Sequence, residues 1–272
     1  MKYKNKWLWS CLLLLAGLAS TTAMAKSFEI AVSPSRFEIS GDGGKRIGQS
    51  IEIQNVGSTA TEVTLRTLDW SYTPDGRITY YDELRPGSCR PWITLERSSV
   101  KIGAKGKKSF RFQAESPPNT PRTECRFMLA VEGIEPAHKT IVESGGASLS
   151  LPVSGRIAVA VYLAVNGAEP KLGMTQVAMQ DVGGKRTPVV TVNNTGDAHG
   201  RLGGSLEAVD SNGQAFELVP EGTPIMPGQT RVLPLSARAI GGGKTPLMAF
   251  PVKATGAIDW EKGSFKVNAE FR

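Results

Sequence analysis

Histidines are the residues of this chain best suited to acid–base or metal chemistry, and the sequence contains two, His138 and His199. They are far apart, and each stands in a turn-rich segment. A zinc site needs several clustered ligands, and a Ser-His-Asp site needs an acid and a nucleophile around one imidazole. Neither clustered metal ligands nor an acid with a nucleophile stands out near His138 or His199 in the sequence. The sequence therefore predicts two exposed loop histidines, no metal site and no catalytic residue.

Acidic and glycine-rich segments offer no better chemistry. Asp69, Asp75, Asp82 and Glu83 cluster around one turn, where carboxylates usually cap turns in solvent. The glycine-rich segments 41–44 and 241–243 match neither the P-loop nor the dinucleotide fingerprint. We expect no cofactor, no bound nucleotide and no enzymatic activity.

The first 25 residues have the pattern of a secretory signal peptide. Lys2, Lys4 and Lys6 precede an apolar run over 7–19, and Ala23-Met24-Ala25 is a small-x-small cleavage site. The alternative is a membrane anchor, but the run is shorter than the roughly 20 residues that a spanning helix needs. We predict cleavage after Ala25 and export to the periplasm.

The cysteines that follow the signal peptide form an even pair. Cys11 leaves with the signal, whereas Cys89 and Cys125 remain. An exported protein reaches an oxidising compartment, and no C-x-x-C spacing suggests redox or zinc chemistry. The sequence predicts a Cys89–Cys125 disulfide.

The net charge of +7 includes three lysines of the signal segment. No long Lys/Arg block with interleaved aromatic residues is present, so we expect no nucleic-acid partner.

The rest of the chain reads as strands and turns. Short runs that alternate apolar and polar residues recur from Phe28 onward, separated by Gly, Pro, Asn and Asp. A turn-rich joint at 165–170 divides them into a domain over 26–165 and another over 166–272. The predicted strands are Phe28–Ile39, Gln49–Asn55, Glu62–Trp70, Arg77–Tyr81, Trp92–Leu95, Lys107–Gln113, Arg126–Glu132, Ala147–Leu163, Met174–Gln180, Pro188–Asn193, Leu202–Val209, Thr230–Leu235, Leu247–Val252 and Phe265–Phe271.

A weak pattern is shared by the two halves. Ile53-Gln54-Asn55-Val56-Gly57 and Val192-Asn193-Asn194-Thr195-Gly196 each place an Asn at the end of an apolar strand and a Gly two residues later. The pattern favours two related β-sandwiches.

The segment 147–163 alternates over an unusual length, with an interruption at Gly155. An exposed apolar edge of this length invites pairing with another chain. One interpretation is a central strand covered by its own domain. The other is a strand lent to a partner by β-augmentation, in which main-chain hydrogen bonds hold the partner and alternate side chains fill its pockets.

Several segments, in their order along the chain, make it similar to the periplasmic fimbrial or pilus assembly chaperones, the PapD-like family. The resemblance covers the chain after the signal peptide and is strongest before Leu163. The matching segments are Val32-Ser33-Pro34-Ser35-Arg36-Phe37, Ile51-Glu52-Ile53-Gln54-Asn55, Pro91-Trp92-Ile93-Thr94-Leu95, 100–112 around Gly106, 122–132 and 149–162.

The resemblance implies an all-β fold of two immunoglobulin-like β-sandwich domains in an L-shaped arrangement. It implies a chaperone that completes an unfinished fimbrial or pilus subunit with a donor strand and delivers it to an outer-membrane usher without ATP. Leu149, Leu151 and Val153 are the donor side chains that we expect to enter the subunit. Client-free molecules are expected to shield these residues by self-association.

The family holds the client's terminal carboxylate with two basic residues. Arg36 aligns with the first. Ala158 stands where the family has its usual second basic residue, a Lys, so Arg156, two residues earlier on the same strand face, is our substitute anchor. Many classical members lack the Cys89 and Cys125 pair.

The alternative function is a secreted two-domain binding module, such as an adhesin or a structural surface protein, that uses the same sandwiches without donating a strand.

Overall fold

The computed structural model describes residues 28–134, 138–144, 147–153 and 155–272 of the chain. The predicted signal peptide over 1–25 lies outside these residues. The described part contains nineteen β-strands and one short 3-10 helix, which confirms the all-β fold. No helix in this part is long and apolar enough to cross a membrane.

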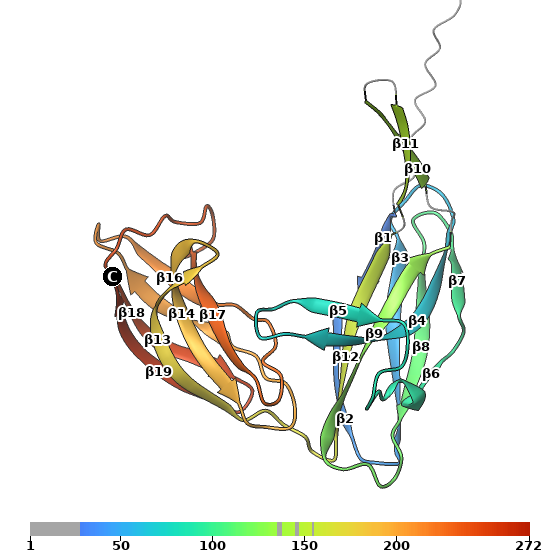
Figure 1. Cartoon of the computed structure of the whole chain (residues 1–272), viewed down its shortest axis with the longest axis horizontal. Coiled ribbons are helices and arrows are strands. Elements are labelled where there is room, and N and C mark those ends of the chain that lie inside the picture. The colour runs from blue at the N-terminus through green and yellow to red at the C-terminus, as the bar shows by residue number, and fades with distance from the viewer. Residues whose placement is uncertain (1–27, 135–137, 145–146, 154) are drawn as a thin grey trace, which may run out of the picture. The chain divides into compact units, whose positions relative to one another are not determined.

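The first half of the chain forms a sandwich of two sheets (Figure 1). One sheet has the strand order β1-β3-β8-β6, and the other has the order β2-β12-β9-β4-β5, with β7 also paired to β4. This division of strands between layers is that of an immunoglobulin-like sandwich. The bounds are β1 Ile30–Ser33, β2 Arg36–Gly41, β3 Arg46–Asn55, β4 Thr61–Tyr72, β5 Ile78–Tyr81, η1 Arg90–Trp92, β6 Ile93–Leu95, β7 Ser99–Ile102, β8 Lys107–Glu115, β9 Thr123–Gly133 and β12 Arg156–Val165.

The core of this sandwich is built by the inward residues of alternating strands. Phe110, Phe112 and Phe127 are fully buried, and the Phe37 and Phe112 rings meet edge to face with centroids 5.1 Å apart. Phe127 meets Phe112 in the same way at 6.2 Å. Because side chains alternate along a strand, the residues that flank Phe37 must lie on the opposite face of the sheet.

The predicted first strand is two strands in different layers. β1 pairs antiparallel with β3, whereas β2 pairs parallel with β12. The chain passes from one sheet to the other over Ser33-Pro34-Ser35, and proline cannot donate to a ladder. As a result β2 begins at Arg36, which is paired with Ala160 in the middle of β12.

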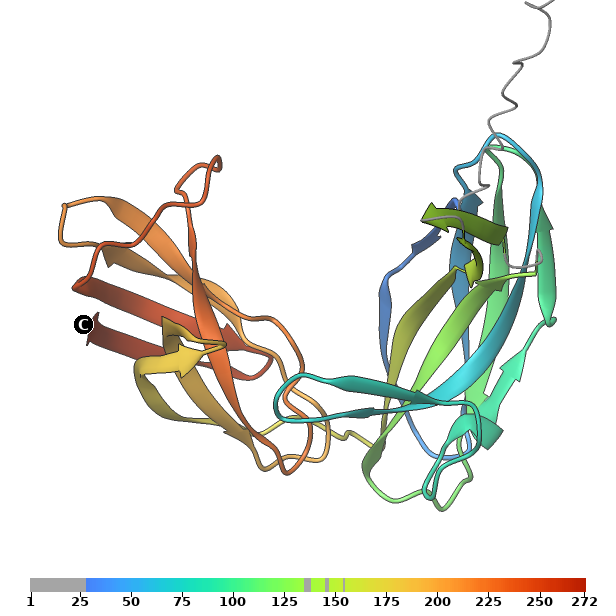
Figure 2. The same cartoon turned by 45° about the horizontal axis from the view of Figure 1, so that its top comes forward.

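The second half of the chain, coloured yellow to red in Figure 2, forms a continuous set of seven strands in the order β13-β14-β17-β16-β15-β18-β19. β17 pairs with β14 over Thr230–Pro234 and then with β16 over Leu235–Arg238, so it passes from one layer to the other. Buried aliphatic residues with Phe216 and Phe271 form its core. The bounds are β13 Leu172–Val182, β14 Lys185–Asn194, β15 Gly203–Val209, β16 Ala215–Pro220, β17 Thr230–Arg238, β18 Val252–Trp260 and β19 Gly263–Phe271.

Strand pairing in the described residues stays within each half, since the first set ends at Val165 and the second begins at Leu172. We therefore propose that the chain has two domains, over 26–165 and 166–272, as the sequence predicts.

The predicted strand Leu247–Val252 is wrong. Residues 245–249 have no regular structure, and Leu247 is 90% exposed, whereas the strand β18 begins at Val252. Pro246 and Pro251 flank the apolar run and remove two backbone donors. The sequence analysis also missed β7, which is short, β10, which is rich in polar residues, and β16.

The two asparagines of the shared sequence pattern perform the same task. Asn55 Oδ1 accepts a hydrogen bond from Gly57 N at 2.9 Å, and Asn194 Oδ1 accepts one from Gly196 N at 2.9 Å. Each amide group also donates to the carbonyl four residues later, that of Thr59 or Ala198. Both asparagines are buried, so each satisfies the backbone of a turn that would otherwise be unpaired.

Between β9 and β12 the chain forms a separate antiparallel hairpin of β10, His138–Ser144, and β11, Ala147–Val153. The predicted long strand 147–163 is thus two strands, β11 and β12, with a break at the expected interruption beside Gly155. His138 lies in β10 and not in a loop.

The disulfide between Cys89 and Cys125 is confirmed, with Cα atoms 5.8 Å apart. Cys89 precedes η1, and Cys125 lies on the inner face of β9. Both residues are buried.

Replacing both cysteines by alanine is expected to lower the free energy of unfolding by about 3 to 4 kcal/mol, because the bond closes a loop with a sequence separation of 36. Urea unfolding of the signal-free chain with and without reductant measures this difference, and reductant should leave the double variant unchanged. Two reactive thiols in the unreduced, unfolded chain are the result that contradicts the bond.

Candidate functional site

Arg36 opens β2 on the outer face of the first sandwich. Phe37 points into the core, so Arg36 and Glu38 both point away from it. Arg36 Nε lies 2.6 Å from Glu38 Oε1, and both side chains are about half exposed. The predicted anchor is therefore accessible and carries an ion pair on its own strand.

A groove of about 420 Å³ opens beside these two residues. Its opposite wall comes from loops and strand ends of the second half of the chain, which include another arginine. The groove is lined by Arg36, Glu38, Arg201, Leu202, Gly203, Gly222, Asp259, Trp260 and Glu261.

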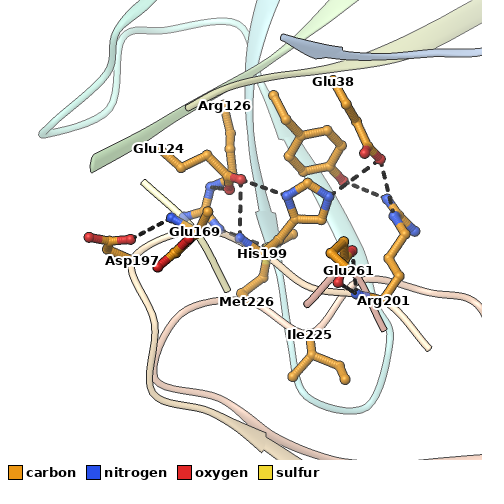
Figure 3. Close-up of polar contacts among 12 residues, drawn as sticks. Glu38, Glu124, Arg126, Glu169, Asp197, His199, Arg201, Ile225, Met226 and Glu261 are labelled. Atoms are coloured by element: carbon orange, nitrogen blue, oxygen red, sulfur yellow. Dashed lines mark hydrogen bonds and ion pairs between the residues drawn. The ribbon is translucent and has the colours of Figure 1, made fainter. Parts of the chain in front are cut away.

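Glu38 lies among three basic side chains, of which Figure 3 shows His199 and Arg201. Besides the contact with Arg36, its Oε1 atom lies 3.6 Å from His199 Nε2 and 3.6 Å from Arg201 Nε. The contact with His199 lowers the pKa of Glu38 most; burial opposes it, and the charges of Arg36, His199 and Arg201 add to it. The pKa falls to about 2, so Glu38 is a carboxylate at any physiological pH.

His199 is buried, with 6% of its side chain exposed, so the predicted exposed histidine is wrong at this position. Its ring stacks on Tyr162 with centroids 3.8 Å apart, and its Nδ1 lies 2.6 Å from Glu124 Oε2. Burial lowers the pKa of the imidazole, but the hydrogen bond with Glu124 and the polar contact with Glu38 raise it more, so the pKa lies above its ordinary value. The sequence offered no signal for this burial, because the partners of His199 are remote in the chain.

The loop that carries His199 is held at two points. Arg122 Nε donates to Asp197 Oδ2 at 2.6 Å, and Glu124 Oε2 accepts from the His199 backbone N at 3.1 Å (Figure 3). Because Arg122 and Glu124 flank the start of β9, this loop positions His199 against the outer face of the β2-β12-β9 sheet.

Arg201 is the cation that sequence reasoning missed. Its guanidinium donates to Gly222 O at 2.8 Å and to the Tyr162 hydroxyl at 3.2 Å. Arg201 Nε and His199 Nε2 are both buried atoms without a hydrogen-bond partner in the described part of the chain. Two basic side chains near Glu38, Arg201 in the groove and His199 beside it, thus each have a buried ring or guanidinium nitrogen without a hydrogen-bond partner.

Raising the pH is expected to lower the free energy of unfolding, because His199 loses its proton and its ion pairs with Glu124 and Glu38 are weakened. Its pKa is higher in the folded chain than the unfolded value of 6.5, so protonated His199 stabilises the fold. This contribution is complete below pH 6.5 and is lost as the pH rises through the folded pKa. Glu124, Glu38, Tyr162 and Arg201 are the polar groups around the ring.

Urea unfolding between pH 6 and 8, with an NMR titration of the imidazole, measures this loss. Glu124→Gln should bring the pKa down, and His199→Gln should remove the corresponding change in stability. An imidazole pKa at or below 6.5 in the unmodified chain contradicts the prediction.

The edge of β12 next to Arg36 is only partly occupied. β12 pairs with β9 along its whole length, Arg156–Val165, whereas β2 covers only Ala160–Val165 on the other side. Among the strands that the structure describes, none pairs with that second edge of 156–159. The backbone groups of 156–159 that point to this second edge therefore have no partner strand immediately before the position of Arg36.

Arg156 lies at the far end of this free segment. It is on the same face as Ala160, about 13 Å along the strand from it at about 3.3 Å per residue. Its guanidinium forms an ion pair with Glu132, whose carboxylate also binds Arg66 Nε at 3.0 Å. Arg156 is not among the residues that line the groove, so its assignment as second anchor stays a prediction.

Leu149, Leu151 and Val153 lie in β11, where Val142, Thr140 and His138 of β10 are their respective partners. Their side chains lie outside what the structure describes, so their role as donor residues also stays a prediction. As for metal chemistry, the described residues contain no group of three or more His, Cys, Asp or Glu side chains that could hold an ion.

Comparison with protein-family models and with curated proteins found no match. Similar solved structures include the YadV chaperone, which is 13% identical, with 89% of this chain and 99% of that chain covered and a TM-score of 0.47. The CupB2 chaperone of Pseudomonas aeruginosa is 12% identical over 89% and 100% of the two chains, with a TM-score of 0.45. The CsuC–CsuE chaperone and tip-subunit pre-assembly complex of Acinetobacter baumannii is 15% identical over 89% and 97%, with a TM-score of 0.43.

Proposed function

We propose that this chain is a non-enzymatic periplasmic chaperone that captures fimbrial or pilus subunits by donor-strand complementation and delivers them to an outer-membrane usher. The observation that carries the proposal is the free edge of β12 over 156–159, which ends beside Arg36. A free strand edge is the surface on which β-augmentation adds a partner strand.

In this proposal the client strand takes the same direction as β2, which pairs parallel with β12. A client strand that lies in line with β2 and runs in the same direction pairs parallel with 156–159. Its last residue then lies next to the first residue of β2, which is Arg36. A client strand that ends there places its terminal carboxylate within reach of the Arg36 guanidinium.

Arginine suits this role because its planar fork can pair with both carboxylate oxygens. Arg201 lines the same groove and is the second basic group that the geometry favours, whereas Arg156 is the one that the sequence favours. Arg201→Ala and Arg156→Ala, compared in one client-binding assay, distinguish the two residues.

Donation of β11 supplies the apolar part of the proposed contact. Leu149, Leu151 and Val153 share one parity of this strand, and each fully buried aliphatic side chain contributes about 1.5 to 3 kcal/mol before ordering costs. Folding of the client drives its release in this scheme, so no nucleotide is needed.

The test is recovery of the tagged mature chain from the periplasm of its own cells. A chaperone should be recovered with a small β-rich subunit whose C-terminal residues are protected from carboxypeptidase. An adhesin should be recovered at the cell surface with a surface ligand instead. Recovery of the chain without any β-rich subunit, in cells that produce fimbriae, contradicts the proposal.

A further inference from the structure

The groove beside Arg36 already contains a carboxylate, which belongs to the chain itself. Glu38 Oε1 makes a short contact with Arg36 Nε at 2.6 Å. The side chain is 43% exposed and follows the anchor by two residues on the same strand face. Glu38 therefore contacts, through one oxygen, the same guanidinium that is proposed to bind the client's terminal carboxylate.

The other two contacts of Glu38 are incomplete. His199 Nε2 and Arg201 Nε each lie 3.6 Å from Glu38 Oε1, which is longer than an N–H···O hydrogen bond. Both nitrogens are buried and lack another partner among the described side chains and backbone. Arg201 Nε always carries a proton, and His199 Nε2 carries one when the imidazole is protonated, because Nδ1 holds the proton shared with Glu124 Oε2. A buried donor without a partner costs free energy, so both nitrogens then favour a closer acceptor.

We propose that Glu38 is an exchangeable ligand of Arg36, which a client carboxylate displaces toward His199 and Arg201. The inference rests on the proposed function for the identity of the client. In the client-free chain Glu38 neutralises Arg36 and competes with any other carboxylate. On displacement it moves closer to His199 Nε2 and Arg201 Nε and accepts their hydrogen bonds, which offsets part of the cost of losing Arg36.

The exchange also acts as a filter on what binds. A neutral or amidated chain end gains little from Arg36 and does not displace a charged ligand from it, whereas a carboxylate does. Asp259 and Glu261 add negative charge to the same groove, and the Glu261 carboxylate is already bound to the backbone N of Arg201 at 3.0 Å. Glu38 is the acid that contacts the anchor.

Acetate tests the exchange on the client-free chain, with acetamide as the uncharged probe of the same size. NMR titration of the backbone amide signal of Phe37, which every variant retains, gives the acetate dissociation constant. Glu38→Gln should bind acetate at least about tenfold more tightly than the unmodified chain, because a charged competitor is removed. Saturating acetate should shift the His199 Nε2 signal in the unmodified chain but not in Glu38→Gln.

Glu115→Gln is the matched control, since Glu115 holds the exposed Arg46 at 2.7 Å through the same kind of contact. It should leave acetate binding at Arg36 unchanged, and Arg36→Ala combined with Glu38→Gln should lose the gain. Equal acetate affinities for the unmodified chain and Glu38→Gln overturn the exchange. So does a gain that survives in the double variant, or equal binding of acetamide.

These outcomes are independent of client capture. An acetate exchange in a chain that recovers no β-rich subunit contradicts the proposed function alone. A chain that recovers the subunit but shows no exchange contradicts the role of Glu38 alone.

Discussion

Arg36→Ala should reduce client binding about 10- to 150-fold while the chain remains folded. Hydrogen bonds to a charged group contribute about 1.5 to 3 kcal/mol, and each 1.4 kcal/mol is a tenfold change in affinity. The Arg36 side chain is about half exposed on the outer face of β2, so its removal leaves no cavity in the core. Co-purification of the client and thermal unfolding of the free variant measure the two effects.

Arg46→Ala is the control for a general loss of positive charge. Arg46 is an exposed strand arginine whose Nε lies 2.7 Å from Glu115 Oε2, and it does not line the groove. Client recovery should be normal for this variant. Normal recovery for Arg36→Ala as well removes Arg36 from the site and leaves the free edge of β12 without its proposed anchor.

Leu151→Asp should abolish client recovery and leave the melting temperature of the free chain unchanged. In the proposed complex Leu151 enters the apolar groove of the client, where an unpaired carboxylate carries a desolvation cost in addition to the lost apolar burial. β11 pairs with β10 in a hairpin of its own, so the free chain should tolerate the charge. Co-purification and thermal unfolding again separate binding from folding.

Ser150→Asp places the same charge on the opposite face of the same strand. Because successive side chains of a strand point to opposite faces, this variant should retain the client. Unfolding of Leu151→Asp at a markedly lower temperature is the outcome that contradicts strand donation. Leu151 then belongs to the apolar core of the chain itself.

Local alternation is the part of this protein that its sequence determined well. The pattern around Phe37 and along β8 and β19 predicts which residues face inward, because the two-residue period of a strand is a local property of the backbone. The even cysteine pair predicted the disulfide for a similar reason, since no third cysteine outside the signal segment competes. The Asn-Gly pattern at Asn55 and Asn194 likewise marks a local turn.

Other features depended on contacts between distant segments. The split of the predicted first strand into β1 and β2 follows from which sheet each piece joins. The apolar positions change parity from Ile30 and Val32 to Phe37 and Ile39, but this local pattern does not say that the two pieces join different sheets. The prediction over Leu247–Val252 failed in the opposite way, because a continuous apolar run between two prolines remains a loop in which Leu247 is exposed.

The environment of Glu38 was decided by the tertiary structure alone. Glu38 comes from β2, Glu124 and Tyr162 from β9 and β12, and His199 and Arg201 from a loop of the second half of the chain. Residue spacing carries no information about which of these charges meet. Their pKa values and unused donors arise only when packing brings them together, since electrostatic and hydrogen-bond energies depend on distance through space.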